Sequence, residues 1–230
     1  MTRLPLAAAL LLACALVGNA GAQDVTLLDR HLHLPPPPGY CIADESHAER
    51  EVVARVRKLI ESQGPFLEMF VDCAELQRRR ADDHGPPDGF DDYGTYSALT
   101  YRGQVLATHP ETRQELLASI ARAAGDDSVA PDAIDKVLKR LRDIGMTFTS
   151  TQNLGVLGLD DSAIYMGVVL SPRGPDDTAP QHVLSVGAIT LVKGIRLSAS
   201  WIRRYERPDD LPVLLADQKR AMSALVAANE

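Results

Sequence analysis

The chain has 230 residues, of which 45% are hydrophobic and 24% are charged, and its formal net charge is -7. This composition is that of a globular protein, and it excludes a fibrous chain or a wholly disordered one. The acidic balance also argues against a nucleic-acid binder held by phosphate contacts.

The first 22 residues have the pattern of a secretory signal peptide. Arg3 supplies a positive start, the run from Leu4 to Val17 is almost wholly apolar, and residues 20–22 are small, as a signal peptidase requires. We therefore expect a mature chain of residues 23–230 that is periplasmic or secreted. No later segment has the roughly 18 continuous apolar residues of a membrane span, so we expect no transmembrane span in the mature chain.

A lipoprotein signal is the competing interpretation of the same segment. Leu11-Leu12-Ala13-Cys14 would then make Cys14 a lipidated first residue. The apolar core before Cys14 is short for such a signal, and the next three residues continue it. We therefore prefer the cleaved signal peptide and keep lipidation of Cys14 as the alternative.

Two cysteines, Cys41 and Cys73, remain after removal of the signal peptide. An even number of cysteines in an oxidising compartment predicts a single structural disulfide. A redox-active pair is more often a close Cys-x-x-Cys, which the sequence lacks. Closing a loop of this length destabilises the unfolded chain by roughly 3 to 4 kcal/mol.

The amino-terminal half of the mature chain alternates between extended and helical patterns. Alternation predicts a strand over 25–34, which ends at four prolines and a turn at Gly39. Helical spacing of apolar residues predicts a helix over 44–63, and a short apolar run predicts a strand over 66–73. The stretch 78–92 has almost nothing to bury, which predicts an exposed loop, strongly acidic near 81–92.

The carboxy-terminal half is richer in strands. The predicted elements begin with a strand or an irregular extended piece over 93–102 and helices over 110–124 and 131–143. Strands over 148–157, 164–170, 182–192 and 195–205 follow, and then a helix over 210–229. Neighbouring strands joined by short turns indicate an antiparallel sheet with helices packed on its faces. We therefore expect an α+β fold in one domain that spans residues 23–230.

Several features together resemble a known group of proteins. They are the segment Leu34-Pro35-Pro36-Pro37-Pro38-Gly39-Tyr40-Cys41, the cysteine at 73 after a strand, two late hairpins and a final helix that ends in Ala227-Ala228-Asn229. This combination resembles uncharacterised exported bacterial proteins related to the Mog1/PsbP-like fold. The resemblance implies an α/β/α sandwich and a binding or assembly factor rather than an enzyme, and it implies no catalytic residues.

The sequence lacks the local motifs of common exported hydrolases, such as Gly-x-Ser-x-Gly, Ser-x-x-Lys and His-Glu-x-x-His. His47-Ala48-Glu49 has the His-x-Glu spacing of zinc deaminases, but the Pro-Cys-x-x-Cys that should follow is absent. We interpret it as the polar start of an amphipathic helix. No catalytic residue and no cofactor are therefore predicted.

Two weak metal-binding hypotheses remain. His31 and His33 lie two apart on a predicted strand, so both rings face one side and could share an ion. The alternative is that, with Leu32 and Leu34 on the core face, the two histidines are simply the solvent face of that strand. The acidic loop is either a solvated segment or a site for a hard cation such as Ca²⁺. Its candidate ligands are Asp82, Asp83, His84, Asp88, Asp91 and Asp92.

Aromatic residues suggest one possible recognition surface. Tyr93, Tyr96 and Tyr101 fall close together, either as half-buried sheet positions or as a surface for a partner. Trp201 is expected to pack under the final helix, and Arg203 and Arg204 are expected at a solvated strand end.

The sequence thus predicts a non-catalytic exported protein that binds an envelope protein as yet unidentified, or assists an envelope process, without binding nucleic acid. The alternative is an exported metal- or small-ligand-binding protein, or a hydrolase, that uses His31 and His33 or the loop from Asp82 to Asp92.

Overall fold

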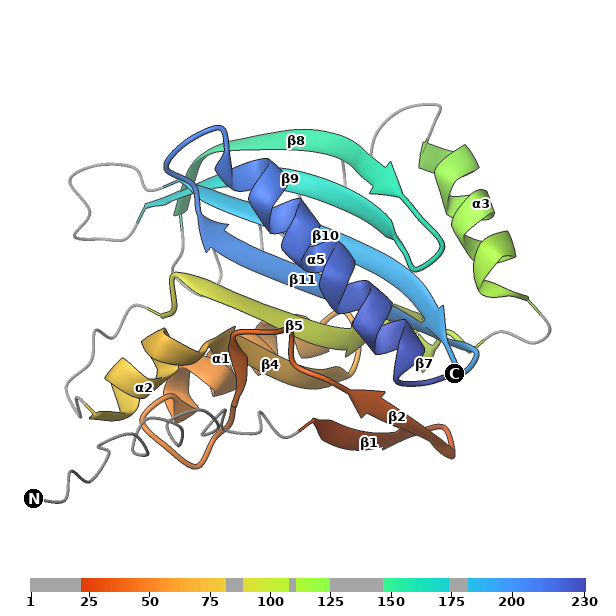
Figure 1. Cartoon of the computed structure of the whole chain (residues 1–230), viewed down its shortest axis with the longest axis horizontal. Helices are drawn as coiled ribbons and strands as arrows, with labels where there is room; N and C mark the ends of the chain where they lie inside the picture. The colour runs from red at the N-terminus through yellow and green to blue at the C-terminus, as the bar shows by residue number, and fades with distance from the viewer. Residues whose placement is uncertain (1–21, 82–88, 108–110, 125–146, 174–181) are drawn as a thin grey trace, which may run out of the picture.

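The computed structural model describes residues 22–81, 89–107, 111–124, 147–173 and 182–230 (Figure 1). Its centre is an antiparallel sheet of seven strands in the order β3-β4-β5-β11-β10-β9-β8. The strands are β3 (Tyr40–Ala43), β4 (Phe66–Asp72), β5 (Asp92–Ala98), β8 (Thr147–Leu159), β9 (Ile164–Arg173), β10 (Val183–Val192) and β11 (Ile195–Arg204). The predicted α+β class is confirmed.

The remaining elements are two small hairpins and the helices. The hairpins pair β1 (Gln23–Leu27) with β2 (Arg30–Leu34), and β6 (Thr100–Tyr101) with β7 (Gln104–Val105). The helices are α1 (Arg50–Glu61), α2 (Cys73–Ala81), α3 (Arg113–Ala124) and α5 (Asp210–Ala227). Among the described residues, no helix is long and apolar enough to cross a membrane.

Helices cover both faces of the sheet. Successive side chains of a strand point to opposite sides, so one strand supplies apolar side chains to a core on each face. Phe70 of β4 packs into the larger core with Trp201 and the buried leucines of α5. Its neighbours Met69 and Val71 pack into a second core with residues of α1 and α2. Figure 1 shows α5 crossing the sheet in front of β10 and β11. The expected position of Trp201 under the final helix is confirmed.

The predicted strand over 25–34 is in fact the β1–β2 hairpin. Leu28 and Asp29 form its two-residue turn, with φ angles of +50° and +59°. Such turns usually carry Asn-Gly or Asp-Gly, and the pattern of alternation runs through this one without interruption. The expected orientation still holds, since Leu32 and Leu34 are fully buried in the larger core.

A side chain near the end of the described chain holds this hairpin in place. Asn229 accepts a hydrogen bond from the backbone N–H of His33 (2.9 Å) and donates one to the His33 carbonyl (2.7 Å). It also donates to the Leu225 carbonyl in α5. The hairpin is thereby fixed across the end of α5.

Several boundaries differ from the sequence-based expectations, among them that of the strand predicted over 93–102, which ends at Ala98 as β5. Helix α1 begins at Arg50 rather than at Asp44, because the Asp44 carboxylate accepts the Ser46 backbone N–H and forms a turn there. The expected exposed loop over 78–92 is also shorter, since α2 continues to Ala81 and β5 begins at Asp92. The predicted helix over 131–143 lies outside the described residues.

The Asp92 carboxylate is the centre of a half-buried polar network. One oxygen accepts hydrogen bonds from Tyr40 Oη (2.7 Å) and Trp201 Nε1 (3.1 Å), and the other accepts from Arg203 Nε (2.8 Å). Arg203 also donates to Tyr40 Oη and to Asp217 of α5. The expectation that Arg203 lies at a solvated strand end is therefore wrong, because its side chain is only 20% exposed.

We predict that Asp92→Asn lowers the free energy of unfolding by roughly 2 kcal/mol, because it removes a charge-assisted hydrogen bond from a half-buried site. Asp91→Asn is the matched control, since Asp91 pairs with Arg204 in solvent, at 64% and 46% exposure. We expect it to cost less than about 1 kcal/mol. Urea denaturation of both variants checks this, and equal losses would contradict it.

Glu68 of β4 is a buried acid that forms no ion pair with any of the described residues. Its side chain is 1% exposed, and among the described residues neither carboxyl oxygen has a hydrogen-bond partner. Desolvation raises its pKa to about 8. Glu68 is therefore protonated in the folded protein at neutral pH, whereas it is ionised in the unfolded chain.

This difference makes stability depend on pH. Because the folded-state pKa is raised, the contribution to stability is complete below the ordinary pKa near 4.5 and is lost as pH rises to about 8. We predict that Glu68→Gln matches the wild type near pH 4 and exceeds its free energy of unfolding by on the order of 3 kcal/mol near pH 8. Denaturation across this range checks it, with Glu61→Gln as a control for loss of one surface charge. Parallel pH profiles of Glu68→Gln and wild type would refute it.

Candidate functional sites

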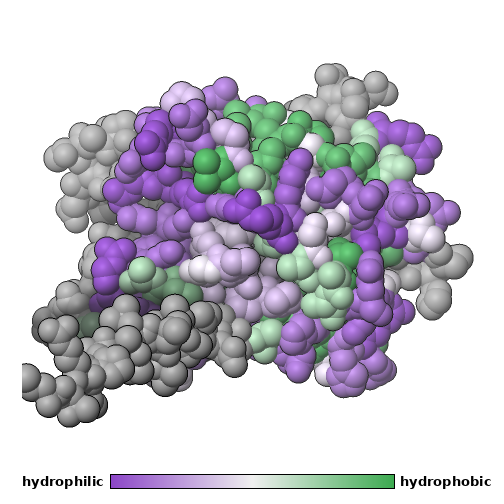
Figure 2. Space-filling view, in the orientation of Figure 1, coloured by the Kyte–Doolittle hydropathy of each residue, from purple (hydrophilic) through white to green (hydrophobic). Residues whose placement is uncertain are grey.

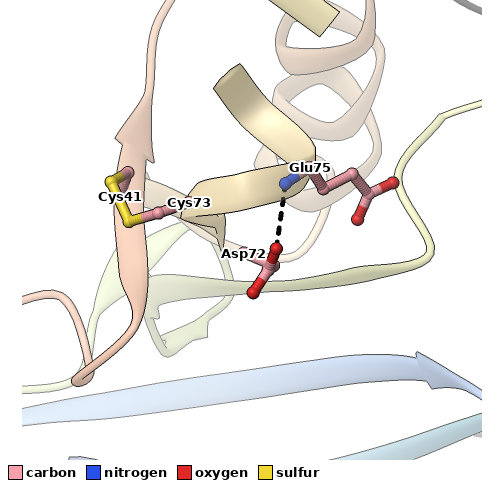
Figure 3. The surroundings of a disulfide bond; sticks show 4 residues. All are labelled: Cys41, Asp72, Cys73 and Glu75. Carbon is pink, nitrogen blue, oxygen red and sulfur yellow. Dashed lines mark hydrogen bonds between the residues drawn. A yellow bond between two sulfur atoms is a disulfide. The ribbon is translucent and has the colours of Figure 1, made fainter. Parts of the chain in front are cut away.

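A disulfide joins Cys41 of β3 to Cys73, the first residue of α2, with Cα atoms 4.9 Å apart (Figure 3). The predicted disulfide is confirmed. Beside it, Asp72 accepts the backbone N–H of Glu75 (2.9 Å) and so caps the first turn of α2. The backbone N–H of Cys73 donates to the Gly39 carbonyl. The bond therefore ties the turn after the prolines to the edge of the sheet.

We predict that the double variant Cys41→Ser, Cys73→Ser lowers the free energy of unfolding by roughly 3 kcal/mol, through the greater entropy of its unfolded chain. Denaturation with and without reductant measures this. Reductant should destabilise the wild type and leave the double variant unchanged. Mass spectrometry of unreduced protein that comprises residues 23–230 should detect no free thiol, and two free thiols would contradict the assignment.

The two hairpin histidines face away from the core and bind partners on β1. His31 Nδ1 lies 2.9 Å from Thr26 Oγ1, and His33 Nδ1 lies 2.8 Å from Asp24 Oδ1. Both contacts follow from the register, which places these residues opposite one another. In these contacts, the ring of His33 meets one carboxylate, that of Asp24, and the ring of His31 meets a hydroxyl group.

The acidic loop is described only at its end. Asp82, Asp83, His84 and Asp88 lie outside the described residues. Asp91 forms an ion pair with Arg204, and Asp92 is the centre of the network above. The described carboxylates of this segment therefore bind arginines.

The three tyrosines do not share a surface. Tyr96 is fully buried in the larger core, and Tyr93 packs partly buried against the second core. Tyr101 is 61% exposed on the β6–β7 hairpin. Tyr93 and Tyr96 thus take the sheet positions that were the alternative to a recognition surface, and Tyr101 alone of the three presents most of its side chain to solvent.

A serine and a histidine lie within hydrogen-bond distance at the end of the sheet. Ser171 Oγ is 2.8 Å from His182 Nδ1 and 2.8 Å from Ser150 Oγ. In serine-dependent enzymes, such a histidine acts as the base that activates the serine hydroxyl as a nucleophile. Ser171 is 1% exposed, however, so a substrate carbonyl has no access to its oxygen. The contacts instead hold β8, β9 and the start of β10 together.

Sequence reasoning set aside His47-Ala48-Glu49 as the start of a helix, but these residues precede α1. It also missed that Asp44 joins His47 and Glu49 in a group with metal-binding chemistry. Asp44, His47 and Glu49 each offer a ligand atom, and these atoms all lie within 4.8 Å of one another. A continuous helix from residue 44 would have turned Glu49 away from the other two, because residues five apart do not share a helix face. The actual turn before α1 brings the three together, and the Asp-Glu-Ser sequence at 44–46 was the available signal for that turn.

Apolar side chains remain partly uncovered at the β8–β9 end of the sheet. Leu154, Leu157 and Val169 pack only partly buried against the larger core. Val156 and Leu159, on the opposite face of β8, are 44% and 49% exposed. Figure 2 shows hydrophobic surface over β8 and β9 beside α5. Among the described residues, no strand pairs with the outer edge of β8.

No family model and no curated protein sequence matches this chain. Among solved structures, it is similar to the solution structure of cyanobacterial PsbP (CyanoP) from Synechocystis sp. PCC 6803, with 14% sequence identity over 95% of this chain and 96% of that one. The TM-score is 0.37. The fold assignment therefore rests on the sheet and helices described above.

Proposed function

We propose that this protein is an exported, non-catalytic binding or assembly factor of the bacterial envelope and that its partner is an envelope protein. The observation that carries the proposal is the partly uncovered apolar surface on β8 and β9. Val156 and Leu159 are both exposed on one face of β8, and exposed apolar side chains gathered on one face are typical of protein interaction sites. The signal-peptide pattern of residues 1–22 supports the location outside the cytoplasm.

The sequence of β8 fits this role. None of its 13 residues is charged, whereas exposed edge strands commonly carry charges that prevent association. Apolar side chains occupy both faces of the strand. Val156 is opposite Met166 and Leu159 is opposite Ile164, and these side chains lie on one face of the pair. Leu154 and Leu157 lie on the other face, where they contact Gly167.

The mode of contact follows from the shape of the strand. Its pairing with β9 shifts register between Phe148 and Ser150, between Asn153 and Gly155, and between Val156 and Gly158. Bulges of this kind bend and twist a strand, which disfavours addition of a further strand along its edge. We therefore propose that the partner contacts the side chains of β8 rather than its backbone.

Affinity purification of the tagged mature protein from a cross-linked envelope fraction tests the proposal. We expect one near-stoichiometric protein partner, and we expect Val156→Lys to reduce its recovery at least tenfold, because it places a charge in an apolar contact. Leu28→Lys is the matched control, since Leu28 is 51% exposed on the distant β1–β2 turn. Recovery of no partner, or equal recovery with both variants, would overturn the assignment of the surface.

A further inference from the structure

The turn before α1 gathers three side chains that bind transition metals. His47 Nδ1 lies 3.1 Å from Asp44 Oδ1 and 4.0 Å from Glu49 Oε1. Asp44, His47 and Glu49 each offer one ligand atom, and among the described residues they are the group whose ligand atoms all lie within 4.8 Å of one another. Two carboxylates and one imidazole are ligand types that Zn²⁺ accepts.

The burial of Glu49 is a separate observation that points to a cation. The Glu49 side chain is completely buried, although it carries a carboxylate at the start of a surface helix. Its Oε1 accepts hydrogen bonds from the Arg80 guanidinium, including one from Nε at 3.0 Å. Its Oε2 is buried and has no hydrogen-bond partner among the described residues. An unsatisfied buried carboxylate oxygen is costly, and a bound cation would satisfy it.

The geometry points to a divalent transition-metal site formed by Asp44, His47 and Glu49, with Zn²⁺ as the ion that fits best. Tetrahedral bonds of about 2.1 Å place neighbouring ligand atoms about 3.4 Å apart. The separations of 3.1 Å from His47 Nδ1 to Asp44 Oδ1 and 4.0 Å to Glu49 Oε1 bracket that value, and all three ligand atoms lie within 4.8 Å of one another. Since Arg80 occupies Oε1, side-chain rotations that turn the unpaired Oε2 of Glu49 toward His47 would close the site. Three protein ligands leave a fourth position for water or an external ligand.

Access and ion class also follow from the surroundings. The side chains of Asp44 and His47 are 48% and 51% exposed, so an ion can enter directly from solvent. Ca²⁺ requires six to eight oxygen ligands, more than this group supplies. The Arg80 cation already offsets part of the acidic charge and holds the Glu49 carboxylate in one orientation, as outer contacts of metal ligands commonly do.

The disulfide restrains both segments that form the site. Strand β3 contains Cys41 and leads directly into Asp44, while α2 begins at Cys73 and carries Arg80 in its last turn. The ligand turn and its arginine are therefore fixed to the same corner of the sheet. This inference does not depend on the proposed partner surface, which lies at the opposite edge of the sheet.

Equilibrium dialysis of the mature protein against micromolar Zn²⁺, followed by elemental analysis, tests the site. We expect one zinc per chain in the wild type. His47→Gln should weaken binding roughly tenfold or more, because it removes the one nitrogen ligand. Since His47 is half-exposed, the metal-free variant should keep the melting temperature of the wild type. Glu49→Gln should also weaken binding if it folds.

His33→Gln is the matched control, because His33 also contacts a carboxylate, that of Asp24, at 2.8 Å. We expect it to retain full zinc binding. Zinc that is lost in His33→Gln and kept in His47→Gln would overturn the assignment and place the ion on the hairpin. No zinc retained by the wild type, or Ca²⁺ bound as tightly as Zn²⁺, would likewise overturn it.

Discussion

The half-buried charge of Asp92 is the constraint on which the packing of this fold depends. A carboxylate between two layers is tolerated only when its oxygens are fully hydrogen-bonded, and here the donors come from distant parts of the chain. Tyr40 belongs to the edge strand β3, Trp201 and Arg203 belong to β11, and Arg203 in turn binds Asp217 of α5. Satisfying one carboxylate therefore fixes the edge of the sheet, its centre and the covering helix relative to one another.

The same contacts bring the large aromatic rings together. Tyr40 meets Trp201 edge to face, with ring centroids 4.6 Å apart, and Phe70 contacts both. Gly94 faces this cluster from β5, where a Cβ atom would lie 2.3 Å from the Phe70 ring. The glycine thus leaves room for the ring, and the aromatic cluster and the polar network form one unit.

Local signals predicted the later strands well and the early ones less well. The β10–β11 hairpin was predictable because ten alternating residues on each side flank Lys193-Gly194, whose positive φ angles suit a tight turn. The turn at Leu28-Asp29 has the same backbone geometry without a glycine, so the sequence gives no sign of it. The start of α1 was placed too early because apolar spacing locates the buried face of a helix and not its first residue.

The candidate sites divide in the same way. Counting cysteines sufficed for the disulfide, since the two cysteines outside the predicted signal peptide, Cys41 and Cys73, allow one intramolecular pairing. The role of Asp92 was not accessible, because its partners lie 52, 109 and 111 residues away in the sequence. The grouping of Asp44 with His47 and Glu49 was missed because these side chains come together only when the helix begins after them.

The clamp between Asn229 and His33 has a consequence for the kinetics of folding. Its two ends are 196 residues apart, and contacts of such separation carry a large loop-closure cost and tend to form late. The β1–β2 hairpin carries the fully buried Leu32 and Leu34, so docking it completes the larger core. Until the rest of the chain is in place, these leucines and the surface that receives them remain exposed to water. Docking of the hairpin therefore covers apolar surface through which an incompletely folded chain can aggregate.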